Sequence, residues 1–188
     1  PLTNIDTRTG HAGQTALGNG GRVGKQSERG NAYGTVDETN ATVGLARLHS
    51  TGEMDTALAL IQNDLFDLGA DLCRPNMAAD ADAEYPPLRI AASQVDRLES
   101  EIDTMNANLT TLKSFILPGG SPLASHMHLC RTVSRRAERL CVELAASEDV
   151  NESAVKYLNR LSDWFFVAGR VANNNGADDV LWVPGANR

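Results

Sequence analysis

This sequence has few aromatic residues, no long apolar run and no excess of positive charge. Aromatic side chains make up 5% of the 188 residues, which disfavours a β-sandwich and suits helices built from Ala and Leu. No apolar run approaches the roughly 18 residues of a membrane-spanning helix. The net charge is −7 and the isoelectric point is near 5.0, which disfavours broad binding to nucleic acid or to a membrane surface. We therefore expect neither as a partner.

Cysteine and histidine are also few and are badly spaced for metal binding. The three cysteines, Cys73, Cys130 and Cys141, are odd in number and form no CxxC pair. The four histidines form no HxxxH or HExxH pattern, so we expect no metal site made of side chains alone. No secretory signal core occurs at the start of the sequence, and unpaired thiols are typical of a reducing compartment. These features predict a cytoplasmic protein.

Helical patterns dominate the chain after its first 31 residues. Capping boxes at Thr35–Glu38 and Ser50–Glu53 predict helices that start near residues 35 and 51. Apolar residues recur at three- and four-residue steps over 54–72 and over 88–112, which predicts a second helix and a long third one. A Pro/Asp/Ala-rich linker over 73–87 separates them.

Clear stop and start signals follow. The Leu-Pro-Gly-Gly sequence at 117–120 ends the third helix, and Ser121 followed by Pro122 predicts the start of the fourth. Asn151 is the predicted cap of the fifth, which the Asn-rich run at 173–176 ends. No segment alternates with a period of two. The sequence thus predicts an all-α five-helix bundle in one domain, with a Gly-rich arm (1–31), a bundle (32–173) and a tail (174–188). We expect the apolar centre of the tail, Val180–Val183, to dock on some other surface.

The arm is rich in glycine and basic residues but is not a P-loop. Residues 8–26 hold six glycines and three Lys or Arg residues. A P-loop needs Gly five residues before its Gly-Lys pair and Ser or Thr after it. Here Asn19 and Gln26 occupy those positions.

The fourth helix carries an unusual group of arginines. Arg131, Arg135 and Glu138 share one face, and four of the 17 basic residues fall within positions 131–139. Arginine suits fork-like contacts with carboxylate or phosphate. A solvated charged face is the alternative interpretation. Taken alone, Asp37 could have the purely structural role of an acid near the start of a helix, where it interacts favourably with the helix dipole.

Five segments, taken in order, resemble the PduO-type ATP:cob(I)alamin adenosyltransferases. These are TRTGHAGQTAL, GGRVGK, AYGTVDETNATVGLAR, FILPGGSPLASHMHLCRTVSRRAER and VNESAVKYLNRLSDWFFVAGR, and the ending DVLWVPG also resembles that family. The resemblance implies a ferritin-like five-helix bundle that assembles as a homotrimer, with active sites at the subunit interfaces. It implies transfer of the 5′-deoxyadenosyl group of ATP to the cobalt of cob(I)alamin, with release of tripolyphosphate and with Mg²⁺ sharing the charge. A reductase or a cobalamin-dependent enzyme is a further implied partner.

The resemblance also implies roles for individual residues. It makes Phe115 the aromatic that displaces the lower ligand of the corrinoid, and Arg131 the partner of Asp37 in the neighbouring subunit. It places Arg135, Glu138 and Asn159 at the ATP. It also makes the arm a phosphate cradle, because glycines let backbone N–H groups converge on an anion. The matching arm positions are Thr7, Arg8, Thr9, Gly10, Gly13, Thr15 and Lys25.

Two positions depart from the family pattern. His11 stands where the arm of the family carries Asp, and Asn31 stands where an acid precedes the tyrosine. These departures leave a second hypothesis open, in which the chain is a diverged nucleotide or cobalamin sensor or carrier with little turnover.

Overall fold

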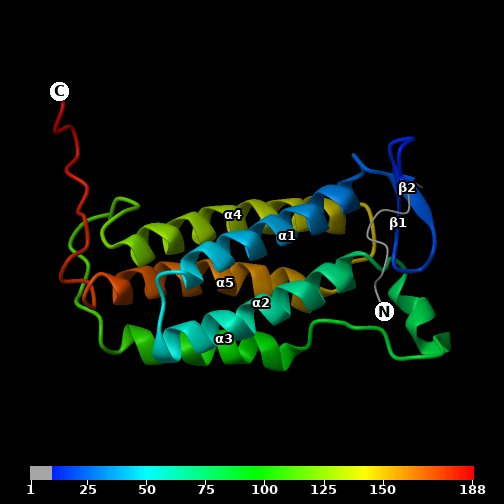
Figure 1. Ribbon diagram of the computed structural model, residues 1–188, viewed down its shortest axis with the longest axis horizontal. Coiled ribbons are helices and arrows are strands. Elements are labelled where there is room, and N and C mark those ends of the chain that lie inside the picture. The colour runs from blue at the N-terminus through cyan, green and yellow to red at the C-terminus, as the bar shows by residue number, and fades with distance from the viewer. Residues whose placement is uncertain (1–9) are drawn as a thin grey trace.

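The protein is an elongated bundle of five α-helices (Figure 1). A computed structural model describes residues 10–188. In chain order the described elements are β1 (Gln14–Ala16), β2 (Arg22–Gly24), α1 (Glu28–Arg47), α2 (Gly52–Leu72), the 3-10 helix η1 (Met77–Asp82), α3 (Ala92–Asn106), α4 (Pro122–Ala145) and α5 (Glu152–Ala172). The all-α prediction is confirmed, apart from the short antiparallel hairpin of β1 and β2 in the arm. The period-two rule missed that hairpin because each strand has only three residues.

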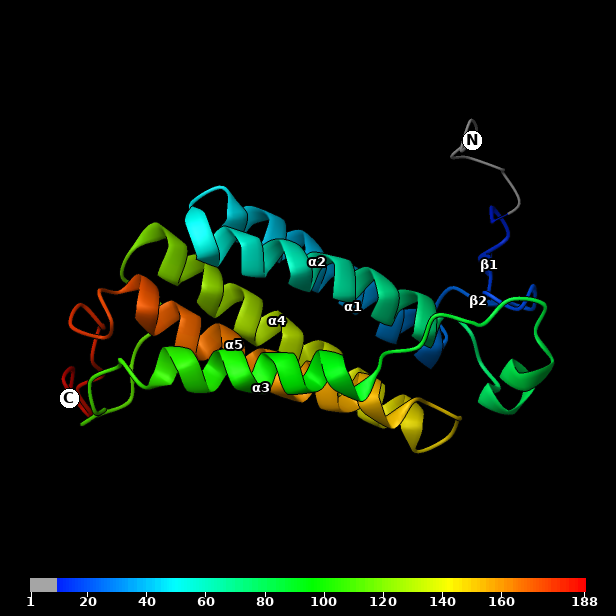
Figure 2. The same ribbon diagram turned by 90° about the horizontal axis from the view of Figure 1, so that it is seen from below.

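Helix α4 packs between α1 and α5, while α2 packs on α1 and α3 packs on α5 (Figure 2). The apolar stripes predicted from the sequence face this core. Its largest fully buried side chains include Trp164, Tyr157 and Phe165. Burying side chains of this size contributes about 1.5–3 kcal/mol each, so the core fixes how the helices carrying polar site residues lie against one another.

Three predicted helix starts, those of α2, α4 and α5, are correct, and that of α1 is wrong. The Ser121 hydroxyl accepts a hydrogen bond from the Ala124 N–H, with Pro122 at the first position of α4. The Asn151 side chain accepts one from the Ser153 N–H at the start of α5. The first helix, however, begins at Glu28 with Ser27 as its cap.

Thr35 fails as a cap because it already lies inside α1. Its hydroxyl donates to the Asn31 carbonyl one turn earlier, at 2.8 Å, which is the usual bond of a threonine within a helix. The arm is therefore shorter than predicted, and residues 28–31 belong to the bundle. Helix α2 starts where expected, although Ser50 donates to Asp55 and provides no cap.

The third helix is shorter than the apolar pattern predicted. It spans Ala92–Asn106, so Leu88 and Leu112 lie outside it. The pair Pro86–Pro87 disfavours a helix just before this segment. Leu88 is exposed, and Leu112 lines a hollow described below. Apolar spacing alone could not separate these residues from the buried stripe.

The C-terminal tail docks on another part of the chain, as predicted. The Leu117 N–H donates to the Val180 carbonyl at 2.7 Å, and the Trp182 N–H donates to the Phe115 carbonyl at 2.8 Å. The tail thereby pairs with the segment that joins α3 to α4. Both lie at one end of the bundle, and the arm hairpin lies at the other (Figure 1).

Candidate active site

A hollow lined by aromatic residues lies where the tail meets the segment before α4. We call it the aromatic hollow. Its volume is about 710 Å³. Phe115 is 76% exposed, and its ring meets that of Trp182 edge-on, with 6.0 Å between centroids. Such exposed aromatic surface is typical of a binding site. The residues that line the hollow are Leu112, Lys113, Ser114, Phe115, Ile116, Arg131, Phe166, Trp182 and Pro184.

Arg131 brings a partly buried positive charge to this hollow. Its Nε lies 3.4 Å from Nδ1 of His128, at the long end for a hydrogen bond. Burial lowers the pKa of Arg131 and the neighbouring Arg135 cation lowers it further, yet arginine stays charged in proteins. A guanidinium in such a place favours an anionic partner.

His128 lies directly beneath Arg131 and is buried. Only 2% of its surface is exposed, and its ring meets Phe166 edge-on. Its Nε2 has no hydrogen-bond partner among the described residues. Burial lowers the pKa of His128, the Arg131 cation lowers it further, and Asp179 acts in the opposite direction. The folded protein therefore holds this imidazole neutral, and the proton-free Nδ1 can accept from Arg131.

Acid should destabilise the fold through His128. The unfolded chain binds a proton at this residue near pH 6.5, whereas the folded chain binds it only at lower pH. The free energy of unfolding should thus fall as the pH drops below about 6.5, by up to about 1.4 kcal/mol per pH unit for this group. Urea unfolding of the wild type and of His128→Gln between pH 5 and pH 7 (about the range in which histidine titrates) should give a shallower slope for the variant. Parallel slopes would contradict a neutral buried His128.

A second group of predicted residues lies together on α4 and α5. The Asn159 Nδ2 donates to Oε1 of Glu138 at 2.7 Å, and the Oδ1 of Asn159 accepts from Arg160 at 2.7 Å. Arg135 is exposed one turn before Glu138 on α4 and forms no ion pair with any residue from 10 to 188. The fold therefore brings Glu138 and Asn159 into contact, with Arg135 one turn away on α4, and their role at the ATP stays a prediction.

The glycines and the lysine of the arm also lie together. The Gly13 N–H donates to the Gly10 carbonyl, and the Lys25 N–H donates to the Gly13 carbonyl at 2.9 Å. Gly13 has φ +77°, which glycine adopts without strain. A Cβ at Gly10 would lie 3.4 Å from Nζ of Lys25, so this ammonium group lies over the loop. Thr15 pairs with Val23 in the hairpin. Thr7, Arg8 and Thr9 lie outside the described residues.

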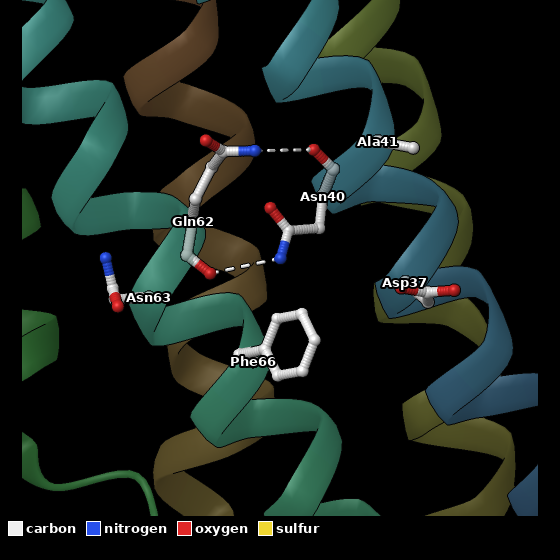
Figure 3. A pocket seen from close by; sticks show the side chains of 6 residues that line it. All are labelled: Asp37, Asn40, Ala41, Gln62, Asn63 and Phe66. Carbon is white, nitrogen blue, oxygen red and sulfur yellow. Dashed lines mark hydrogen bonds between the residues drawn. The ribbon is translucent and has the colours of Figure 1, made fainter. Parts of the chain in front are cut away.

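Asp37 does not meet its predicted partner, Arg131, within one chain. It is exposed on α1 and lines a hollow of about 400 Å³ between α1 and α2. Figure 3 shows Asp37 with Asn40 on α1 and Phe66 with Gln62 on α2 around this hollow. Within residues 10–188, no hydrogen bond or ion pair joins Asp37 to Arg131. The predicted pairing therefore does not form within a subunit.

The part of the chain that the structure describes contains neither a membrane-spanning helix nor a metal-binding cluster. None of the helices is long and apolar enough to cross a bilayer. In the same part of the chain, no group of three or more His, Cys, Asp or Glu residues could hold a metal ion.

Sequence reasoning missed Phe166 and Trp182 in the aromatic hollow, and it missed His128, which contacts the lining residues Arg131 and Phe166. His128 precedes Arg131 by three positions on α4, which places it on the same face. Phe166 and Trp182 lie in apolar segments of the sequence, and the apolar pattern does not indicate that these two side chains line a common hollow. Only the docked tail brings Trp182 to Phe115.

Comparison with known proteins agrees with this geometry. The family model described as cobalamin adenosyltransferase matches residues 5–172. The corrinoid adenosyltransferase of Mycobacterium tuberculosis is 50% identical over 191 residues, covering 100% of this chain and 96% of the relative. The corrinoid adenosyltransferase of Bacillus subtilis is 44% identical, covering 96% of this chain and 92% of the relative.

Solved structures show the same likeness. One is a variant of the PduO-type ATP:corrinoid adenosyltransferase from Lactobacillus reuteri in which alanine replaces a phenylalanine, complexed with cobalamin and ATP. It has a TM-score of 0.85 at 37% identity. The comparison covers 95% of this chain and 99% of that chain. With both hollows and the arm in place and the family model matching most of its length, this chain belongs to the cobalamin adenosyltransferase family.

Proposed function

We propose that this protein transfers the 5′-deoxyadenosyl group of ATP to the cobalt of a reduced corrinoid and releases tripolyphosphate. The single observation that carries the proposal is the aromatic hollow, in which exposed Phe115 and Trp182 lie beside the guanidinium of Arg131. A corrin ring offers a broad apolar face that such aromatic edges can cover. Family membership supports the same reaction.

The phosphates of ATP are assigned to the arm and to the α4–α5 surface. The ammonium of Lys25, which lies over the glycine loop, supplies a donor for an anion. Arg135 offers a fork of N–H donors with no competing carboxylate among the described residues. Mg²⁺ would be held mostly by phosphate oxygens and water, with the second carboxylate oxygen of Glu138 as its ligand from the protein. When bound, it neutralises charge on the leaving tripolyphosphate.

The nucleophile in this reaction is the reduced cobalt of the substrate, so no side chain needs to act as a base. The protein aligns cobalt, C5′ and the leaving oxygen, and its cations stabilise the charge that develops on the phosphate. We assign to Phe115 the displacement of the lower ligand of the corrinoid, which would make the Co(II) form easier to reduce.

We also propose that the active site is shared between the subunits of a homotrimer. Helix α4 has 24 residues and runs from one end of the bundle to the other, so the two ends lie about 36 Å apart. The arm hairpin at one end binds α2 through the Gly18 N–H and the Cys73 carbonyl, and the aromatic hollow lies at the other end. Asp37 and Arg131 remain apart in one chain. Assembly would let Asp37 of one subunit meet Arg131 of the next.

Anaerobic incubation with chemically reduced cob(I)alamin and Mg-ATP tests the reaction. The adenosylcobalamin spectrum should appear, and tripolyphosphate should form in equal amounts. If ATP binds but no product forms at micromolar protein, the alternative is favoured, namely a diverged sensor or carrier. That alternative rests on His11 and Asn31. We further propose a cytoplasmic location and delivery of the reduced corrinoid by a reductase.

Mg-ATP should protect the arm from trypsin. A ligand bound at the cradle reduces the population of open arm in proportion to 1 + [L]/Kd. At a ligand concentration of 100 times Kd, cleavage after Lys25 should thus slow about 100-fold. Cleavage after Lys113, which is exposed in the segment before α4 at the other end of the bundle, provides the internal control. Equal rates with and without Mg-ATP would show that the arm binds no nucleotide.

A further inference from the structure

A buried ion pair lies at the end of α5, behind the aromatic hollow. Nε of Arg170 lies 2.7 Å from Oδ2 of Asp179, and their side chains are 5% and 2% exposed. Arg170 belongs to α5 and Asp179 to the C-terminal tail. The pair therefore fixes the tail to the bundle three residues before Trp182. The predicted ATP and corrinoid residues do not include either of them.

The same cluster holds the other segment of the hollow. Nη2 of Arg170 donates to the Thr110 carbonyl at 2.7 Å. Asn173, which is 2% exposed, accepts from the Ser121 N–H at 2.9 Å and donates to the Gly119 carbonyl at 3.1 Å. Its Nδ2 also lies 3.3 Å from Oδ1 of Asp179. Phe115 lies between the two anchored points, Thr110 and Gly119.

Packing at the turn before α4 leaves no room for a side chain at Gly120. A Cβ at Gly120 would lie 2.2 Å from Oδ1 of Asn173, and Gly120 has φ +105°. The turn thus closes directly over the Asn173 amide. A second close approach occurs at Gly176, where a Cβ would lie 2.6 Å from Nη2 of Arg170. Both chain segments rest on the cluster without intervening side chains.

We propose that Arg170, Asn173 and Asp179 are positioning residues for the corrinoid site, which hold Phe115 and Trp182 at the spacing that a corrin ring requires. The proposal rests on the proposed function, because that function assigns the hollow to the corrinoid. Phe115 is largely exposed and Trp182 is 44% exposed, so their own contacts do little to fix them. Buried charge pairs add little to stability compared with apolar packing, but they can select one arrangement of the chain. Residues held in place before the ligand arrives bind it without an ordering cost.

The test uses two variants of Asp179 and one control. Asp179→Asn removes the negative charge. Asp179→Glu keeps the charge but lengthens the side chain by one methylene, which displaces the tail from Arg170. Glutamate at position 179 can still pair with the buried guanidinium of Arg170, so this second variant is expected to fold. The matched control is Glu152→Gln, which breaks the exposed pair of Glu152 with Lys156 on the same helix. Full-length protein is used throughout.

Two measurements are made on each protein. Steady-state kinetics give KM for cob(I)alamin and for ATP separately. Acrylamide quenching of tryptophan fluorescence, without any substrate, reports how accessible Trp182 is. The protein has two tryptophans, and Trp164 is 1% exposed. Trp182→Phe, made in each background, gives the Trp164 signal to subtract.

We expect both Asp179 variants to raise KM for cob(I)alamin by at least about tenfold, since small displacements of a binding group have large effects. KM for ATP should stay within about twofold of wild type, Trp182 should be quenched faster, and Glu152→Gln should match wild type. Wild-type KM for cob(I)alamin and wild-type quenching in Asp179→Glu would overturn the proposal. So would equal increases of both KM values, which indicate general destabilisation. If the wild type forms no adenosylcobalamin, the proposed function fails, while the quenching result still decides whether the cluster positions Trp182.

Discussion

Replacing Arg131 with alanine should lower kcat/KM for both substrates by about 10²- to 4 × 10³-fold. Removing one member of a buried ion pair costs about 3–5 kcal/mol, and each 1.4 kcal/mol corresponds to tenfold in rate. Arg131 is already partly buried, and no carboxylate of its own chain pairs with it among the described residues. In the proposed trimer, Asp37 of the neighbour would be that partner, and the subunit interface would exclude water from both.

A matched control is available on the same helix. Arg136 pairs with Glu38 of α1, and both side chains are about half exposed. Exposed pairs contribute about 0–1 kcal/mol, so Arg136→Ala should change kcat/KM by no more than about fivefold. Asp37→Ala should reproduce the Arg131→Ala loss, and the double variant should lose little more. Independent, additive losses would contradict the pairing, as would sedimentation of the wild type as a monomer at micromolar concentration.

Phe115→Ala should weaken corrinoid use by about 10- to 150-fold, because burial of a phenylalanine contributes about 1.5–3 kcal/mol. The ring is mostly exposed in the ligand-free protein, so this gain appears only when the substrate covers it. KM for ATP should not change, since Phe115 lies apart from Arg135, Glu138 and Asn159. The loss should be larger when the assay starts from cob(II)alamin and a reductant than from cob(I)alamin, because Phe115 is assigned to displacing the lower ligand.

Tyr85→Ala provides the comparison for this variant. Tyr85 is an exposed aromatic of similar size, 75% accessible, in the loop between η1 and α3. It lines none of the hollows described above, and its replacement should leave both KM values unchanged. Equal losses from cob(II)alamin and cob(I)alamin for Phe115→Ala would remove the role in ligand displacement. An unchanged KM for the corrinoid would remove Phe115 from the site.

Local signals in the sequence located most of the bundle correctly. Ser121 with Pro122 and Asn151 were identified as helix starts because capping depends on hydrogen bonds within three residues. Glu138 and Asn159 were assigned to one site through the family resemblance, and the structure joins them at 2.7 Å. The Thr35 box failed because a threonine can equally bond one turn back inside a helix.

The sequence by itself therefore determined the helical class, the core stripes and the family, because each depends on short-range periodicity or on ordered motifs. Only the tertiary structure decided that the tail lies beside Phe115, that His128 lies buried under Arg131, and that Asp37 lies apart from them. It also decided where α3 ends, since Leu112 continues the apolar pattern yet lines the hollow. The physical reason is common to all of these. Which apolar or polar side chains meet depends on contacts between segments 50 or more residues apart, such as Trp182 with Phe115, and no local pattern records such contacts.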